Sequence, residues 1–238
     1  MRVRRAPAYD RRMSESRSAG PARAPRPAQA ERALLCDALT ERGPAAPTEC
    51  AGWTTADLAA HLVVREGRPD AAPGILLPPL ARYTERVRRR TAARVPFDEL
   101  VERVRQGPPR FSPYRVPVVD NNANTVEFFV HHEDVRRASA QWEPRELTSE
   151  LEQALWARIK IARFVLRNVP VEVNLVRPDG RAARVARGRR GPSAGSVRVH
   201  GPVGELVLWA LGRTDVARVR PTGPTAAVNA LTEAGWGL

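Results

Sequence analysis

The chain has 238 residues, of which 39 are basic and 26 acidic, giving a formal net charge of +13 and a pI near 11.3. A hydrophobic content of 42% excludes a wholly disordered chain, and the length allows one large domain or two smaller ones. The longest uncharged stretch, 71–81, contains three prolines and is far shorter than the roughly 20 apolar residues that span a bilayer. The basic N-terminal residues are not followed by the apolar segment of a signal peptide, so we expect a cytoplasmic protein with no membrane partner.

The positive charge is concentrated at the two ends of the sequence. Residues 1–30 carry +6, residues 31–166 carry +1 and residues 167–238 carry +6. Lys160 is the single lysine, and this arginine bias, with abundant Ala and Pro, is typical of coding by a GC-rich genome. Basic ends attract polyanions at low salt, which keeps nucleic-acid binding as a minority hypothesis. The absence of a basic helix with interleaved aromatic residues argues against it.

The first part of the sequence predicts a leader followed by helices. Residues 1–28 have no apolar periodicity and are expected to form a disordered basic leader, whose true start is Met1 or Met13. Apolar residues then recur at helical spacing from Gln29 to Arg42. A second helix is expected after Thr54, which would cap it with Asp57 as the capping-box partner, and should end near Glu66.

Further helices are predicted beyond a proline-rich loop at 69–79. Their expected ranges are 80–93, 96–105, 121–140 and 147–168, and apolar positions of the last one, including Leu151, Leu155, Ile159, Ala162, Phe164 and Leu166, should be buried. Short connections between helices are typical of a bundle. We therefore predict a helical bundle over residues 29–168.

The apolar period changes from helical to alternating after Pro170. Strands are predicted at 171–176, 183–186, 196–200 and 216–219, with an amphipathic helix at 203–211. Residues 170–238 should therefore form a small α+β domain appended to the bundle, so that the fold class is α plus α+β.

Two cysteines, Cys36 and Cys50, without C-x-x-C spacing do not indicate a disulfide framework in a chain of intracellular type. Either thiol could be a nucleophile. Cys36 falls among leucines on a predicted helix, where a small buried apolar role is more common.

The histidines carry most of the functional information. His61 lies on the core-facing side of its predicted helix, and Glu127 and His131 are four residues apart on one face of another. His132 is rotated by about 100° from that face and has at most a supporting role. His200, on a predicted strand, is interpreted as half-exposed.

An ionised carboxylate inside an apolar bundle requires a partner, and a metal cation is one solution. His61, Glu127 and His131 offer two nitrogens and one oxygen, a set that suits a catalytic Zn²⁺ with one open position. Ni²⁺, Fe²⁺ or Co²⁺ would also fit, so the metal identity stays open. Taken singly, a Glu and His at helical spacing are more often a surface ion pair, and a lone His is more often a core residue.

Three motifs together resemble a known family. They are G-W-T-T-A-D-L-A-A-H-L at 52–62, the pair Glu127 and His131, and the segment from Gly201 to Arg213. In this order they resemble the mycothiol-dependent maleylpyruvate isomerase family, part of the DinB-like superfamily. The run from His61 to Asp70 is similar to an actinobacterial subgroup described only as metal-binding proteins. The resemblance covers roughly residues 30–235.

The resemblance implies a DinB-like four-helix bundle followed by a sterol-carrier-like domain, with His61, Glu127 and His131 as metal ligands. It also implies mycothiol as co-substrate, a thiol expected in GC-rich actinobacteria. Arg65, Arg68 and Arg213 are candidates to orient substrate carboxylates, because a guanidinium matches a carboxylate in a bidentate way. Arg213 also fits a simpler interpretation, as a cation at a helix end.

Two functions on this bundle stay open. The first is a metal-dependent enzyme that activates a low-molecular-weight thiol for transfer to a small electrophile or for thiol-assisted isomerisation. The second is a non-catalytic metal-binding or regulatory protein. Sharing a bundle and a metal site does not by itself transfer an activity. The substrate and the oligomeric state are not predictable from this sequence.

Overall fold

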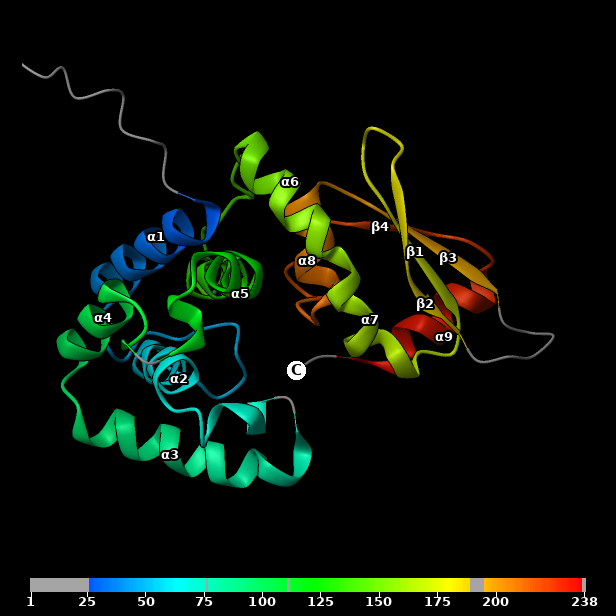
Figure 1. The fold of residues 1–238 in the computed structure, drawn as a ribbon. Helices are drawn as coiled ribbons and strands as arrows, with labels where there is room; N and C mark the ends of the chain where they lie inside the picture. The colour runs from blue at the N-terminus through cyan, green and yellow to red at the C-terminus, as the bar shows by residue number, and fades with distance from the viewer. Residues whose placement is uncertain (1–25, 76, 111, 189–194, 237–238) are drawn as a thin grey trace, which may run out of the picture.

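The computed structural model describes residues 26–75, 77–110, 112–188 and 195–236. A helical N-terminal part is followed by a small four-stranded mixed sheet with helices, which confirms the predicted fold class (Figure 1). Residues 1–25 of the predicted leader lie outside the described residues. Within the described ranges, no helix is both long and apolar enough to cross a membrane.

Four helices surround the core of the N-terminal part: α1 (Pro27–Arg42), α2 (Thr55–Gly67), α4 (Phe97–Gln106) and α5 (Pro117–Arg137). Their buried apolar side chains meet in one cluster that includes Leu35, Leu39, Leu58, Leu62, Leu100 and Phe128. The remaining helix, α3 (Ala81–Arg94), packs on α2 at the outer edge of the helical part (Figure 1). The predicted loop at 69–79 contains two 3-10 turns, Ala72–Ile75 and Pro78–Leu80.

Helix α2 begins as its sequence predicts. Thr54 is the N-cap residue, its hydroxyl accepts the Asp57 N–H, and the Asp57 carboxylate accepts the Thr54 N–H at 3.0 Å. This capping box satisfies two backbone donors that a helix start leaves unpaired. It therefore fixes the residue at which α2 begins, and with it the face on which His61 lies.

Helix α5 differs from its predicted range of 121–140. It begins four residues earlier, at Pro117, because proline is tolerated in the first turn of a helix, where an N–H has no helical acceptor. It ends at Arg137. A further 3-10 turn, Pro113–Arg115, leads into it.

The single helix predicted at 147–168 is interrupted. Helix α6 (Ser149–Arg158) is followed by a 3-10 turn (Ile159–Ile161), the short helix α7 (Ala162–Val165) and another 3-10 turn (Leu166–Asn168). The prediction that Phe164 is buried is wrong, because Phe164 is 71% exposed. The other five are buried in the same apolar cluster as the strands.

The sheet has the strand order β2-β1-β3-β4, in which β1 runs antiparallel to β2 and parallel to β3. The strands are β1 (Glu172–Val176), β2 (Ala182–Arg187), β3 (Ser196–His200) and β4 (Arg220–Thr222). Alternate residues of β1 and β3, such as Val173 and Val197, are fully buried. The predicted alternation therefore identifies the covered face correctly.

The prediction of a last strand at 216–219 is wrong. The backbone there bonds to side chains, since the Val216 carbonyl accepts from Arg137 and the Arg218 N–H donates to Glu205, and β4 starts only at Arg220. The helix predicted at 203–211 is α8 (Val203–Ala210), and a second helix, α9 (Thr225–Ala234), follows the sheet without having been predicted.

Arg137 and Glu205 join α5 to α8. Their bidentate contacts are 2.6 and 2.9 Å long, and the two side chains are only 2% and 5% exposed. Arg137 also donates to Glu133 on its own helix. A buried charge pair of this kind fixes the end of α5 against the C-terminal part of the chain.

Candidate metal centre

The three residues predicted as metal ligands converge. His61 comes from α2, and Glu127 and His131 come from successive turns of α5. The Oε1 atom of Glu127 lies 3.2 Å from His61 Nε2 and 3.3 Å from His131 Nε2. One ligand atom from each residue lies within 4.8 Å of the others, and both histidines are only 8% exposed. These residues form a candidate metal-binding group.

The sequence around His61 explains how its ring is held. Trp53 packs beside the imidazole with ring centroids 5.1 Å apart, and Arg88 lies 4.7 Å above the Trp53 ring. Arg88 also pairs with Asp57, the capping-box partner of Thr54. The Trp and Asp of the motif at 52–62 therefore both position the helix turn that carries His61.

The surroundings of Glu127 and His61 set the protonation states of these two side chains. Burial alone would raise the pKa of Glu127, but Arg65 and the two histidines outweigh it and hold that pKa well below its ordinary value. Burial lowers the pKa of His61, which Glu127 opposes only in part. Near neutral pH the carboxylate is therefore ionised and His61 is neutral, the forms in which both residues bind metals.

His131 is held differently from His61. Burial alone would lower its pKa, but hydrogen bonds to Asp134, Cys50 and Glu127 raise it well above the ordinary value. Its Nδ1 lies 2.9 Å from Asp134 Oδ2, while Nε2 faces Glu127. An Nδ1–H that donates to a carboxylate leaves Nε2 for a metal, which is the usual arrangement around metal-binding histidines.

Asp134 belongs to the candidate site although it is not among the residues predicted from the sequence. It is 0% exposed, and Arg213 from the C-terminal part donates to both of its oxygens at 2.8 and 2.9 Å. Burial alone would raise the pKa of Asp134, but His131 and Arg213 lower it. The signal in the sequence was the spacing of three residues after His131, which puts both side chains on the same helix face.

Cys50 offers a second, overlapping donor set. Its Sγ lies 3.1 Å from Asp134 Oδ2 and 3.8 Å from His131 Nδ1, so Cys50, His131 and Asp134 also satisfy the spacing of metal ligands. In this set, however, both carboxylate oxygens of Asp134 accept hydrogen bonds from Arg213, whereas Arg65 contacts Glu127 at Oε1. The set around Glu127 is therefore the better candidate for a divalent cation.

Arg65 holds Glu127 in place. Its Nε lies 3.1 Å from Glu127 Oε1, and its Nη atoms donate to the Asn124 side chain and to the Ala123 carbonyl. The guanidinium also stacks 4.8 Å from the centre of the Tyr114 ring. All of its donor nitrogens therefore have protein partners in the structure.

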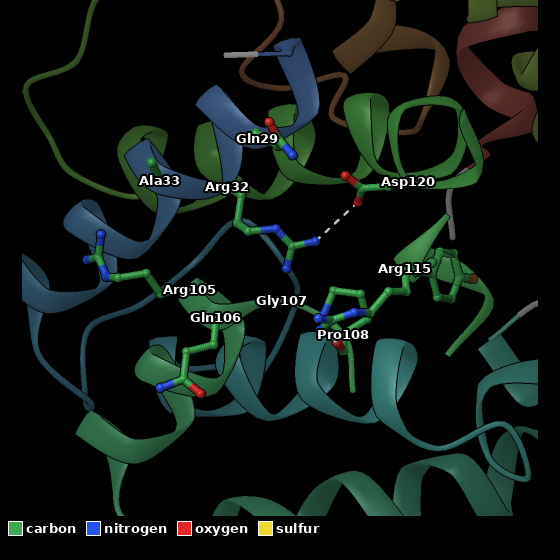
Figure 2. A pocket seen from close by; sticks show the side chains of 10 residues that line it. Gln29, Arg32, Ala33, Arg105, Gln106, Gly107, Pro108, Arg115 and Asp120 are labelled. Carbon is green, nitrogen blue, oxygen red and sulfur yellow. Dashed lines mark hydrogen bonds and ion pairs between the residues drawn. The ribbon is translucent and has the colours of Figure 1, made fainter. Parts of the chain in front are cut away.

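A buried polar network continues from Arg65 to the N-terminal end of α5. Asn124 donates to Glu66 and to Asp120 at 2.7 Å, and Arg32 binds Glu66 through both terminal nitrogens. Figure 2 shows Arg32 reaching from α1 toward Asp120, 3.3 Å away, at the wall of a small pocket. This network places two carboxylates and a cation at the α1, α2 and α5 interface and fixes the helices that carry the candidate ligands.

The structure gives each predicted substrate-orienting arginine a protein partner. Arg65 binds Glu127, Arg213 binds Asp134, and Arg68 pairs with Asp70 at the surface, just beyond the C-terminal end of α2. Arg213 also donates to the Leu211 carbonyl at the end of α8, which agrees with a helix-end cation. A contact of any of these arginines with a substrate stays a prediction.

The other two histidines lie apart from the group. His132 Nδ1 lies 3.2 Å from Glu31 Oε2, in a separate network with Arg145. His200 is half-buried on β3 and contacts Thr222. Neither residue belongs to the candidate ligand sets within the described residues.

Fold and site together define a helical protein with an appended α+β part and a candidate metal-binding group between α2 and α5. No family model matches the sequence, and no curated protein does either. Two solved structures match, the mycothiol-dependent maleylpyruvate isomerase and a mutant of it, each at 15% identity over 82% of this chain and 90% of that chain. The TM-score is 0.46 in both cases, and no activity follows from so distant a likeness.

Proposed function

We propose that this chain is a divalent-metal-dependent enzyme that activates a low-molecular-weight thiol, of the mycothiol-dependent maleylpyruvate isomerase type. The observation that carries the proposal is the convergence of His61, Glu127 and His131 within one small volume. Two imidazoles and one carboxylate are three ligands, which leaves a coordination position for a further molecule. The motif resemblance supplies the thiol and the reaction type.

The donor set fits such a metal chemically. Zn²⁺ is the first expectation for two nitrogens and one oxygen, and Ni²⁺, Fe²⁺ or Co²⁺ accept the same ligands. A divalent metal at this site lowers the pKa of a bound thiol and so supplies the thiolate, the reactive nucleophile. The proposal does not use the protein's own thiols, and Cys36 in particular is fully buried, which raises its pKa to about 11.

The residues of the chain have distinct roles in this proposal. Glu127 and the two imidazoles would hold the metal, Arg65 would keep the Glu127 carboxylate in position, and Asp134 would orient the His131 ring. The thiolate would add to a double bond conjugated to a carbonyl group, and the electron pair would move onto the carbonyl oxygen as an enolate. After rotation about the resulting single bond, the double bond would re-form and expel the thiolate, so that the substrate is isomerised and no thiol is consumed. In the transfer variant, the thiolate displaces a leaving group and stays attached to the product.

Metal analysis of the purified protein is the first test. We expect close to one divalent metal per chain, lost in His61→Ala and Glu127→Ala and retained in His200→Ala, the matched control on β3. Metal-free wild-type protein after purification without chelators, still unable to take up added Zn²⁺ or Co²⁺, would overturn the proposal.

Thiol binding separates the two candidate functions. In the cobalt-substituted protein, added mycothiol should produce a sulfur-to-cobalt charge-transfer band, and mycothiol-dependent isomerisation of maleylpyruvate is the activity to assay. A protein that binds cobalt but shows neither a change of spectrum with thiols nor turnover would instead be a non-catalytic metal-binding protein on the same bundle.

A further inference from the structure

A groove lies on the other side of α2 from the candidate metal centre. It is bounded by α2, α3 and the C-terminal end of α4, with a volume of about 650 Å³. Val63 and Gly67 line it, whereas His61 and Arg65 leave α2 on the face toward α5. Figure 1 shows α3 at the outer edge of the helical part. Residues of α3, among them Arg90 and Arg94, line the outer side of the groove. The volume is in the range of small-molecule sites.

The groove has an apolar part and a cationic part. Val63 and Val95 are partly exposed and contribute apolar surface, and Val64 and Val87 lie almost fully buried at the lining. Four arginines also line the groove, and two of them are already paired on the surface, Arg68 with Asp70 and Arg103 with Glu99.

The other two arginines, Arg90 and Arg94, carry unbalanced charge. Among the residues that the structure describes, neither has a carboxylate within 4.0 Å, and both are exposed. The one carboxylate in the lining, Glu66, is engaged by Arg32 and Asn124. The wall of α3 therefore presents two uncompensated guanidinium groups to the groove.

Arg90 and Arg94 are also one helical turn apart. Like charges at this spacing destabilise a helix, and an anion bound between them would remove that cost. A phosphate monoester carries between one and two negative charges near neutral pH and accepts bidentate hydrogen bonds from guanidinium groups. The valines beside them require an apolar body on the same molecule.

We propose that this groove binds a small phosphate monoester with an apolar body, its phosphate between Arg90 and Arg94 and its apolar part on Val63 and Val95. The site is separate from the candidate metal centre and does not depend on the function proposed for it.

The experiment is a calorimetric titration of the purified protein with 1-naphthyl phosphate. We expect saturable binding at least about tenfold tighter than that of inorganic phosphate, of 1-naphthol, and of 1-naphthoate, which carries one charge less. The double variant Arg90→Ala/Arg94→Ala should weaken binding by at least about fivefold. Arg82→Ala/Arg86→Ala removes the same charge from exposed positions of α3 outside the groove and should change the affinity by less than about twofold.

Several results would overturn the proposal. One is the absence of saturable binding, and another is an equal loss of affinity in both double variants, which would indicate attraction by net charge alone. Naphthol binding as tightly as its phosphate would refute recognition by the arginines. The variant His61→Ala should bind 1-naphthyl phosphate as the wild type does, and a loss in that variant would place the ligand at the metal centre instead.

Discussion

Replacement of Asp134 by Asn tests how the C-terminal part of the chain supports the candidate metal centre. The substitution keeps the size of the side chain and removes its charge. In the native protein Asp134 is fully buried and receives the His131 Nδ1–H at 2.9 Å, and Arg213 donates to both of its oxygens. The variant therefore loses the orientation of one ligand and the balance of a buried cation at the same time.

Both losses have expected magnitudes. Removal of one partner from a buried ion pair costs about 3–5 kcal/mol, and because the Arg213 side chain is 13% exposed, we expect the lower end, about 3 kcal/mol. For a chain of this length that corresponds to a Tm lower by about 6–12 °C. Loss of the carboxylate behind a metal-binding histidine weakens metal affinity by about 10–100-fold.

Two assays measure these effects separately. Thermal unfolding of the metal-free proteins reports stability, and competition with a chromogenic chelator reports affinity for Zn²⁺. Asp98→Asn, at an exposed aspartate in the first turn of α4, is the control. It should leave the metal affinity unchanged and lower the free energy of unfolding by at most about 1 kcal/mol, the contribution of a charge near a helix N-terminus. Asp134→Asn/Arg213→Met should regain part of the lost stability, because the unpaired cation is gone.

The reasoning fails in either of two cases. One is a metal affinity of Asp134→Asn within about twofold of the wild type, which would mean that the carboxylate does not orient His131. The other is an equal or lower Tm in the double variant, which would mean that the unpaired Arg213 is not the source of the instability.

Three further predictions follow from the charges of the structure. Because the pKa of His131 is raised, metal binding near pH 7 should release about one proton; calorimetry in buffers of different ionisation enthalpy measures this release, and a value of zero or two protons would contradict the prediction. In the metal-free protein, the stability that protonated His131 contributes is fully present below about pH 6.5 and is lost as the pH rises through the raised pKa. Cys36 should react with a thiol reagent at pH 8 only on the timescale of unfolding, so rapid modification of both thiols of the native protein would refute its assignment to the core. Arg137→Met should lower the free energy of unfolding by about 3–5 kcal/mol, because it breaks the buried pair with Glu205. Arg105→Met, at an exposed ion pair, should lower it by less than about 1 kcal/mol, and chemical denaturation that gives the same loss for both variants would contradict the role of the buried pair.

Local signals in the sequence predict the parts of the site that lie on single helices. Thr54 and Asp57 mark the start of α2, and the four-residue spacing of Glu127 and His131 places both on one face of α5. The inward position of His61 was predictable because α2 is amphipathic and its predicted start and end agree with the structure. These inferences need only the helical period and the capping chemistry.

Contacts between distant parts of the chain were not predictable in the same way. Cys50 and Arg213 meet at Asp134 although they are 163 residues apart, and nothing local in either segment indicates the other. The strand expected at 216–219 is displaced for a related reason, since its backbone is used by the buried pair of Arg137 and Glu205. Long-range partners override local pattern at these positions.

The most direct test of the account is X-ray absorption of the zinc-loaded protein, measured without added thiol. The account predicts two imidazole nitrogens and a carboxylate oxygen at about 2.0–2.2 Å and no sulfur in the first coordination sphere. A sulfur at about 2.3 Å would place the metal at Cys50, His131 and Asp134 instead and would contradict the central claim that His61, Glu127 and His131 bind it.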